Sequence, residues 1–411
     1  MFYKLARIAL LTAAATCIVP AAAEPSSTDW PQFRGIHRNG ISAETGLLEE
    51  WPEGGPAEVW RIPIGQGFSG IAVVGDRLYT MFAATAEAPS EFAAAFDART
   101  GKELWRTPVG KRFDDQFGNG PRSTPTVHGD TVFVMSSRGN VAALDRETGN
   151  LRWGLDLGQA FGSKIPRWGF SPSALVDGEK VILEAGAPDG KSYVALDRGT
   201  GKVLWTTGET QSMGYSSPLA VEIGGQRQYV GVVPYRLRAL DPSGKEIWSQ
   251  DWPRGETIAM PVFVPPDRIF LSGAEGVGAH LLQIEVEEGK ARAQEVWSEP
   301  SFRNHFSSSV VDGDHIYGFD NATLKCIGLA DASLAWAKRG FGKGSLIAAD
   351  GHLYILADNG KLMLVRATPE AYREVGSVQA LEGRSWTSPT LSGGRIYLRN
   401  LSEMVAYDVK G

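Results

Sequence analysis

The sequence predicts an all-β fold: an eight-bladed β-propeller built from four-stranded antiparallel blades. Two observations carry this prediction. A short phrase recurs along the chain, in which a small residue and an acidic turn residue precede Thr-Gly-Lys, or a relative of it, and then Trp. Seven of the twelve tryptophans also recur 39 to 52 residues apart, most of them at the end of this phrase. These are Trp60, Trp105, Trp153, Trp205, Trp248, Trp297 and Trp336. Such a period indicates one supersecondary unit used many times.

Each copy of the phrase reads as strand, tight turn, strand. In residues 95–105 and 143–153 the Asp is expected to start the turn by hydrogen bonding to its own downstream backbone. The Gly supplies the positive φ that closes a short hairpin loop. The Trp then lies on the outgoing strand, where a large flat side chain can fill the seam between neighbouring sheets. We therefore interpret the repeated Asp, Thr, Gly and Trp as turn and packing residues.

A second hairpin precedes each phrase. It begins with Ser-Pro or Ser-x and continues as an apolar run, a Gly turn and another apolar run, as in residues 171–183 and 388–398. Asp-Gly and Gly-Gly pairs between apolar runs are hairpin signals. Two hairpins per period give four strands, which is the unit of a propeller blade.

Weaker copies complete the count of eight. In one of them Val375 is expected at the position of the repeated Trp. The last copy, residues 406–408, has no Trp after it, and Trp60 has no acidic turn before it. We therefore expect the last strand to pair with residues 58–61. One blade is then shared by the two ends of the ring, and the unpaired edges of an open sheet disappear.

Residues 1–23 read as a secretory signal peptide. Two basic residues precede an apolar run, and three alanines precede Glu24. The apolar run is too short to span a bilayer, and no other segment is long enough, so we expect a periplasmic or secreted protein without a transmembrane segment. Cys17 would be the lipidated residue if the chain were a lipoprotein, but Thr16 stands where a smaller residue is expected.

The mature chain divides into residues 24–57, an extended arm, and residues 58–411, the propeller. Trp30 and Phe33 of the arm are expected to pack on the ring, since a mobile linker rarely carries such rings. After signal cleavage only Cys326 remains, so stability must come from core burial and ring closure. The formal net charge of −6 argues against nucleic-acid binding, and we expect a monomer.

The repeated phrase resembles the repeat of the pyrroloquinoline-quinone (PQQ) type β-propellers, and the resemblance covers nearly all of the mature chain. The segment 30–35, Trp-Pro-Gln-Phe-Arg-Gly, is similar to the start of exported bacterial propellers of this superfamily. Those families are eight-bladed. They include quinone-dependent alcohol dehydrogenases and the non-enzymatic propeller component of the outer-membrane protein assembly machinery.

The resemblance to the enzymes implies PQQ with calcium, held by Glu, Asn and Asp, together with an Asp base and a vicinal Cys-Cys disulfide. The chain has no Cys-Cys pair and no Cys-x-x-Cys-His. We therefore favour an exported non-catalytic scaffold that binds an envelope protein or peptide, or a small anionic ligand. A PQQ-dependent alcohol or sugar dehydrogenase is the alternative. A glycan-binding module is a third interpretation, which requires Trp168 and Trp386 to be exposed.

Propeller ligand sites lie where the innermost strands begin, so the segments just before each Ser-x start should line one mouth of the channel. Five cations fall there against one carboxylate, Glu256. The candidate ligand-binding residues are Arg122, Arg167, Trp168, Tyr215, Arg303, Asn304, His305, Lys343, Arg384 and Trp386. Arg offers bidentate hydrogen bonds and the rings offer stacking, so a planar or carboxylate-bearing anion is predicted. No residue is assigned a catalytic role, although His305 and Glu256 are the candidates for proton transfer.

Overall fold

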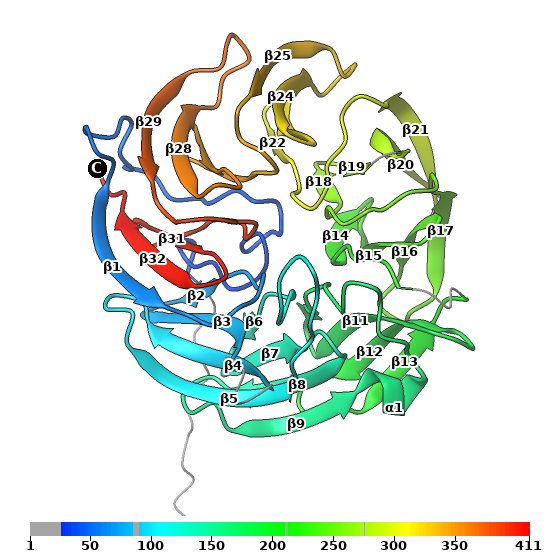
Figure 1. Cartoon of the computed structure of the whole chain (residues 1–411). Helices are drawn as coiled ribbons and strands as arrows, with labels where there is room; N and C mark the ends of the chain where they lie inside the picture. Colours follow the sequence, from blue (N-terminus) through cyan, green and yellow to red (C-terminus); the bar gives the residue numbers. More distant parts are fainter. Residues whose placement is uncertain (1–25, 85–89, 210–212, 275) are drawn as a thin grey trace, which may run out of the picture.

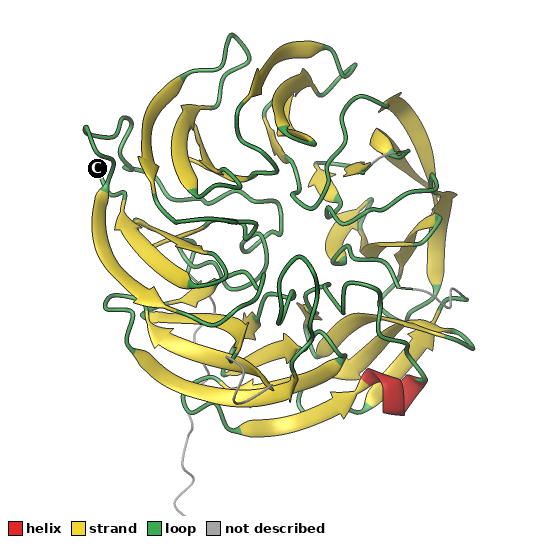
Figure 2. Cartoon of the chain, viewed as in Figure 1, coloured by secondary structure: helices red, strands yellow, loops and turns green. Residues whose placement is uncertain are grey.

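The computed structural model describes residues 26–84, 90–209, 213–274 and 276–411. Eight four-stranded antiparallel sheets are arranged around a central channel, which confirms the eight-bladed propeller (Figure 1). Apart from one short helix, α1 (Leu157–Phe161), the regular structure of the described residues is β-strand (Figure 2). The predicted signal peptide, with Cys17, lies outside the described residues.

The blades follow one another in sequence order, each with its first strand innermost. Blade 1 holds β2 (Ala72–Val74), β3 (Arg77–Ala83), β4 (Ser90–Asp97) and β5 (Glu103–Lys111). Blade 2 holds β6 (Thr126–His128), β7 (Thr131–Met135), β8 (Asn140–Asp145) and β9 (Leu151–Asp156). Blade 3 holds β10 (Leu175–Asp177), β11 (Lys180–Ala187), β12 (Lys191–Asp197) and β13 (Val203–Thr207). Blade 4 holds β14 (Leu219–Ile223), β15 (Gln226–Val233), β16 (Arg236–Leu240) and β17 (Glu246–Asp251).

The second half of the ring repeats this order. Blade 5 holds β18 (Val262–Val264), β19 (Arg268–Gly273), β20 (Gly278–Glu287) and β21 (Lys290–Glu299). Blade 6 holds β22 (Val310–Asp312), β23 (His315–Asp320), β24 (Thr323–Gly328) and β25 (Leu334–Arg339). Blade 7 holds β26 (Ser345–Ala349), β27 (His352–Leu356), β28 (Lys361–Arg366) and β29 (Glu374–Gln379). Blade 8 holds β30 (Thr390–Ser392), β31 (Arg395–Arg399), β32 (Glu403–Asp408) and β1 (Ala57–Pro63).

Six of the seven repeated tryptophans donate from the indole N–H to the next blade, as predicted for a seam residue, whereas Trp248 donates to Gln228 of its own blade. The Nε1–H of Trp105 in blade 1 donates to the carbonyl oxygen of Arg146 in the turn of blade 2 (3.1 Å). Trp153 donates in the same way to Arg198 of blade 3 (2.8 Å). Gly149 lies beneath the Trp105 ring, where a Cβ atom would come within 2.6 Å of it, and its φ is 72°. The repeated Gly is therefore required both for the turn and for the approach of the ring.

The repeated Asp organises the turn that receives this ring. The Oδ1 atom of Asp97 accepts from the backbone N–H of Arg99 (3.0 Å) and of Thr100 (2.9 Å), and from the Thr100 hydroxyl (2.9 Å). Asp145 and Asp197 accept from their own Thr in the same way. The expected role of Asp as a turn initiator is confirmed.

The ring closes as predicted, by pairing between the two ends of the propeller. Strand β1 runs antiparallel to β32, with Trp60 opposite Ala406. Arg399 of blade 8 is buried and donates to the Thr80 hydroxyl (3.0 Å) and the Met81 carbonyl (2.7 Å) of blade 1. Blade 8 is therefore a sheet made from both ends of the propeller, and a buried cation connects it to blade 1 at their seam.

One expectation about the repeat is wrong. In blade 7 the residue in register with the repeated Trp is Gly376, which lies opposite Leu364 just before the strand bulge, and not Val375. Trp51 of the arm occupies the vacant space, because a Cβ atom on Gly376 would come within 2.5 Å of the Cβ of Trp51. Trp51 contacts Tyr354 at 6.2 Å between ring centroids, matching the 6.1 Å between a repeated Trp and Tyr79 in blade 1.

The arm also runs through the centre of the ring (Figure 1). Trp30 is buried and exchanges two backbone hydrogen bonds with Val73 of blade 1 (2.8 Å each). Ile41 forms a parallel bridge with Ala348 of blade 7. Between them, Arg38 donates to the carbonyl oxygen of Pro218 in blade 4 (2.8 Å). The arm therefore crosses the channel beside the innermost strands.

Candidate functional site

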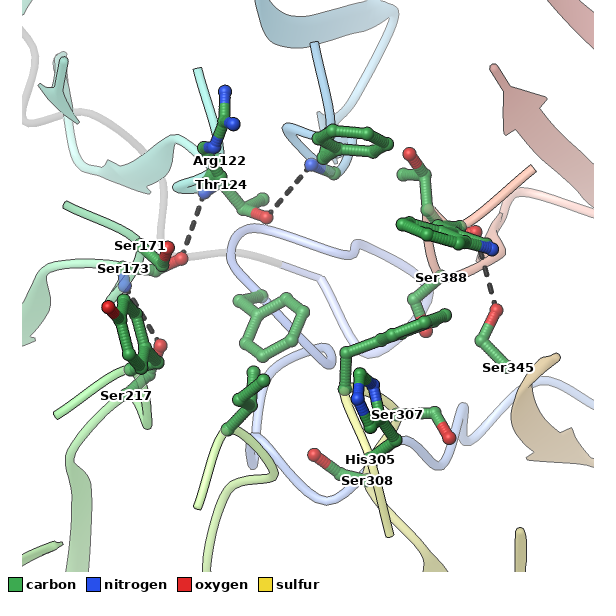
Figure 3. Close-up of a pocket in the computed structure, with 18 of the residues that line it drawn as sticks. Arg122, Thr124, Ser171, Ser173, Ser217, His305, Ser307, Ser308, Ser345 and Ser388 are labelled. Atoms are coloured by element: carbon green, nitrogen blue, oxygen red, sulfur yellow. Dashed lines mark hydrogen bonds between the residues drawn. The ribbon is translucent and has the colours of Figure 1, made fainter. Parts of the chain in front are cut away.

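A cavity of about 290 Å³ lies at the end of the channel where the innermost strands begin. We call it the cup. Its lining residues, drawn in part in Figure 3, are Phe33, Arg34, Phe68, Gly70, Asp115, Phe117, Arg122, Thr124, Trp168, Ser171, Ser173, Tyr215, Ser217, Glu256, Ile258, His305, Phe306, Ser307, Ser308, Lys343, Ser345, Trp386, Thr387 and Ser388. All eight blades contribute through the loops that precede their innermost strands. The arm contributes Phe33 and Arg34. A volume of this size is at the small end of the range for ligand sites.

Hydroxyl side chains at the start of the innermost strands fix the wall of the cup. The backbone N–H of Thr124 donates to the Ser173 hydroxyl (2.9 Å), and the N–H of Ser173 donates to the Ser217 hydroxyl (2.8 Å), as the dashed lines in Figure 3 show. The N–H of Gly70 donates to Thr124 in the same way (3.1 Å). Each of these bonds joins one blade to the next. The recurring Ser of the sequence is thus an inter-blade contact that also lines the cup.

One side of the cup is an aromatic cluster centred on Trp386. Phe68 is stacked with Trp386 at 5.8 Å and an interplanar angle of 25°, and Phe306 lies at 5.0 Å from it. The Arg384 guanidinium lies over the Trp386 ring at 4.5 Å and donates to the carbonyl oxygen of Phe117 (2.6 Å). Arg384 therefore holds the cluster together from outside the cup, whereas Trp386 lines it.

Trp168 and Tyr215 form a second aromatic wall, with ring centroids 5.2 Å apart. Both side chains are half-buried, and burial raises the pKa of Tyr215. Arg167 is exposed and lies over Trp168 at 5.2 Å. Like Arg384, Arg167 covers an aromatic ring and does not itself line the cup.

Arg122 lines the cup, but the carboxylate of Asp115 lies close enough to neutralise part of its positive charge. Its Nη2 atom lies 3.8 Å from a carboxylate oxygen of Asp115 and donates to the carbonyl oxygen of Gly118 (3.0 Å). The guanidinium lies over the Phe113 ring at 4.9 Å, and burial lowers the pKa of Arg122. Asp115 was not anticipated from the sequence, because the loop that brings it back to Arg122 has no repeat signature.

Lys343 and His305 lie together in the cup, with 3.2 Å between Lys343 Nζ and His305 Nε2. Glu256 lies on the same cup wall as the only other lining carboxylate besides Asp115 among the described residues. Burial raises the pKa of Glu256, while the positive charges of Arg167 and Lys343 oppose this effect. Lys343 therefore lines the cup with its ammonium group beside the His305 imidazole.

Two predicted site residues have structural contacts instead. Arg303 forms an ion pair with Asp320, with 2.8 Å between Nε and Oδ1. Asn304 is buried, donates to the carbonyl oxygen of Phe319 (2.9 Å) and accepts from the Ser309 hydroxyl (2.9 Å). The structure thus brings six of the ten predicted residues into the cup: Arg122, Trp168, Tyr215, His305, Lys343 and Trp386. Arg167, Arg303, Asn304 and Arg384 lie outside it.

Arg34 is a further cation at the cup that the sequence interpretation missed. It is buried and donates to the carbonyl oxygens of Ser308 (3.1 Å) and Asn39 (2.7 Å). Burial lowers the pKa of Arg34 to about 9, so the guanidinium stays charged at neutral pH. Among the described residues it forms no ion pair with a carboxylate. The Phe-Arg pair of segment 30–35 was visible in the sequence, but nothing there placed the arm inside the ring.

The side chains of the cup do not fit a calcium-supported quinone site. Calcium requires six to eight oxygen ligands. No group of three or more His, Cys, Asp or Glu residues suited to a metal is found in the described part of the chain. Asp115 faces Arg122, and Asn304 is occupied by internal hydrogen bonds.

The fold is that of an eight-bladed β-propeller with a cup at one mouth of its channel. The chain belongs to the family described as outer membrane protein assembly factor BamB, whose model matches residues 90–338. Among curated proteins, polyvinylalcohol dehydrogenase of Pseudomonas sp is 29% identical over 210 residues. This match covers 49% of the chain but only 23% of that protein's length.

Solved structures of both kinds of propeller share the fold. BamB from Moraxella catarrhalis superposes with a TM-score of 0.62 at 15% identity, covering 86% of this chain and 99% of that one. Quinohemoprotein alcohol dehydrogenase from Comamonas testosteroni superposes with a TM-score of 0.66 at 12% identity, covering 93% and 81%. At these identities the likeness establishes the fold alone. In the described residues no helix is long and apolar enough to cross a membrane.

Proposed function

We propose that this chain is an exported, non-catalytic propeller of the cell envelope that binds an anionic ligand with a flat apolar body in the cup. Membership of the BamB family supports a scaffold in the envelope. The cup itself supports the ligand class, because two aromatic walls can hold a flat body and cations can hold its charge.

One observation carries the proposal: cations exceed carboxylates in a cup that the arm helps to line. The lining cations are Lys343, Arg122 and Arg34, against Asp115 and Glu256. Arg34 is buried without an ion pair among the described residues, so its positive field is little screened by solvent. An anion in the cup would offset the cost of burying that charge.

A quinone-dependent dehydrogenase is the second candidate. The stacked pair of Phe68 and Trp386 favours it, since a planar cofactor could lie against these rings. The donor set of the cup argues against it, because neither Asp115 nor Glu256 belongs to a group that could hold calcium. We therefore favour a propeller that binds a ligand without catalysis.

Binding of a matched pair of probes tests the proposal. We expect 2-naphthoate to quench tryptophan fluorescence saturably and its uncharged amide to bind at least about tenfold more weakly, a difference of about 1.4 kcal/mol. Lys343→Gln should weaken naphthoate binding by a similar factor because it removes a lining cation. Arg303→Gln is the matched control and should have no effect, since Arg303 is paired with Asp320 outside the cup.

Equal binding of acid and amide, or equal effects of the two substitutions, would contradict the anion site. A separate assay addresses catalysis, in which PQQ and calcium are added to the purified protein and dye reduction is followed with alcohols. Turnover would overturn the non-catalytic assignment whatever the naphthoate result.

A further inference from the structure

The outer edges of the eight blades differ in charge. Every outermost strand has an unpaired edge, which is a template for another strand unless charge, bulges or cover prevent it. Seven of them carry at least one charged residue; these are β1, β5, β9, β17, β21, β25 and β29. Strand β13, with the sequence Val-Leu-Trp-Thr-Thr, carries none. Among the outer strands that the structure describes, β13 is therefore the one without the charge that normally prevents strand addition.

The side chains of β13 favour strand pairing. Val203 and Leu204 are 49% and 48% exposed, and they are adjacent in the chain. Trp205 is anchored in the seam with blade 4, where its Nε1–H donates to the carbonyl oxygen of Pro242 (3.1 Å). Thr206 is exposed as well. Valine, threonine and tryptophan are all enriched in strands, so the edge combines a fixed backbone with exposed residues suited to a sheet.

The register of the repeat shows that the outer edge of a blade can accommodate a charged residue at the position of Leu204. Leu204 directly precedes the repeated Trp of blade 3, and Arg152 holds the same position in blade 2. Arg152 forms ion pairs with Asp130 and Asp145. A charged residue is thus compatible with this position in the fold. Other blades also carry an apolar residue there, namely Leu104, Ile247, Val296 and Ala335, but their outer strands have charges elsewhere.

We propose that β13 is a docking edge, to which an extended segment of a partner protein, uncharged between its two ends, adds as a fifth strand of blade 3. The exposed charges that flank β13 define the ends of that segment, because Lys202 precedes the strand and Glu209 follows it. An antiparallel partner strand would carry a basic residue near Glu209 and an acidic residue near Lys202. Strand addition supplies affinity through the backbone and specificity through alternate side chains.

The occupant is a different protein and not a second copy of this chain. The formal net charge of −6 makes two copies repel each other. Two β13 strands would also bring no opposite charges within the strand to offset this repulsion. The inference rests on the rim of blade 3 and is independent of any ligand in the cup (Figure 1).

A designed peptide tests the inference. The probe is the fluorescein-labelled octapeptide Lys-Thr-Val-Thr-Val-Thr-Val-Asp with blocked termini, measured by fluorescence anisotropy on the full chain. We expect saturable binding and slower amide hydrogen exchange at β13. Leu204→Lys should weaken binding at least about tenfold, because it places a charge on the edge. Leu104→Lys is the matched control, since Leu104 holds the same position on β5 and is 42% exposed.

Both substitutions lie on an exposed rim, so circular dichroism should show that each variant is folded. Absence of probe binding, equal weakening by the two substitutions, or protection of a strand other than β13 would overturn the inference. Dimerisation of the free chain that Leu204→Lys abolishes would also overturn it, because the occupant would then be a second copy.

Discussion

At the scale of single residues, Glu184 shows how burial changes the ionisation of a side chain in this ring. It is fully buried in blade 3, and its Oε1 atom accepts from the backbone N–H of Gly214 (2.5 Å). Burial raises the pKa of Glu184 to about 8, against smaller lowering effects from this hydrogen bond and from Arg238. The side chain is therefore mostly neutral in the folded protein at pH 7.

This ionisation makes stability depend on pH. The unfolded state releases the Glu184 proton near the ordinary pKa of about 4.3, and the folded state holds it up to about pH 8. The contribution of Glu184 is therefore present below pH 4 and is lost as pH rises between about 4 and 8. We expect Glu184→Gln to raise the melting temperature relative to the native chain progressively over this range, with no further gain above pH 8.

Exposed Glu222 of β14 provides the control for this measurement. Calorimetry of Glu222→Gln should give the same pH dependence as the native chain. If Glu184→Gln followed the native profile as well, the carboxyl group would have to be ionised in the folded state.

The sequence could place individual site residues only where the repeat register reached them. Lys343, His305 and Trp386 come just before a Ser-x start, and the innermost strands carry that position to the cup. Arg303 lies two residues before His305 in the same segment, but it forms an ion pair with Asp320 of β23 outside the cup. Such a tertiary partner leaves no periodic signal, so the choice between lining the cup and pairing outside it could not be predicted.

At the scale of elements, blade 7 differs from the other blades in the source of its seam tryptophan. Gly376 holds the register of the repeated Trp, and the ring that packs there is that of Trp51. Every other blade carries its seam Trp on its own outer strand, whereas blade 7 receives Trp51 from the arm. The arm is therefore an integral part of the hydrophobic core of blades 7 and 8, where Trp51 packs with Tyr354 and Leu381.

Substitutions at these two positions should compensate for each other. Trp51→Ala removes a buried ring, and we expect a loss of about 3–5 kcal/mol in the free energy of unfolding. Gly376→Trp alone should also destabilise, because its Cβ would clash with Trp51. The double variant should be more stable than either single variant, since the new ring lies in the register of the repeated Trp. Denaturant unfolding of the four proteins measures this coupling.

If the losses in the free energy of unfolding were simply additive in the double variant, Trp51 would not take the place of the repeated Trp.

The strands around Gly376 were predictable, since hairpin signals and periodic apolar runs specify four strands per repeat. The arm was predicted only as an extended segment, because its Pro- and Gly-rich sequence has no period. Its route through the channel depends on contacts with blades 1, 4 and 7, which are distant in sequence.

At the scale of the whole molecule, ring closure depends on the seam between blades 8 and 1. Arg399 is buried there, and burial lowers its pKa to about 9. Its donors satisfy carbonyl oxygens of Met81 and Gly65. Closure itself was predictable from sequence, because the last repeat lacks an outer strand and Trp60 lacks the turn that should precede it.

Replacing this cation should open the ring at one seam. Arg399→Met keeps much of the side-chain volume but leaves buried carbonyls without donors, so we expect a loss of about 2–4 kcal/mol. Hydrogen exchange should accelerate first in β1, β3 and β32. Arg395→Met, a less buried position on the same strand, should have a smaller effect. An increase spread evenly over all eight blades would contradict a special role for this seam.

The pairing of β1 with β32 also sets an order of events in time. Ala57 lies opposite Asp408, so the first strand of the ring can pair only after residues 403–408 have been synthesised. The blades between them can form one after another from local hairpins, but the final sheet joins segments about 350 residues apart, and contacts of such separation form slowly. Until then the seam tryptophan of β1 and the turn that receives it belong to an open arc. The boundary between blades 7 and 8 and the boundary between blades 8 and 1 therefore form at nearly the same time. A chain whose synthesis stops before β32 forms neither of them.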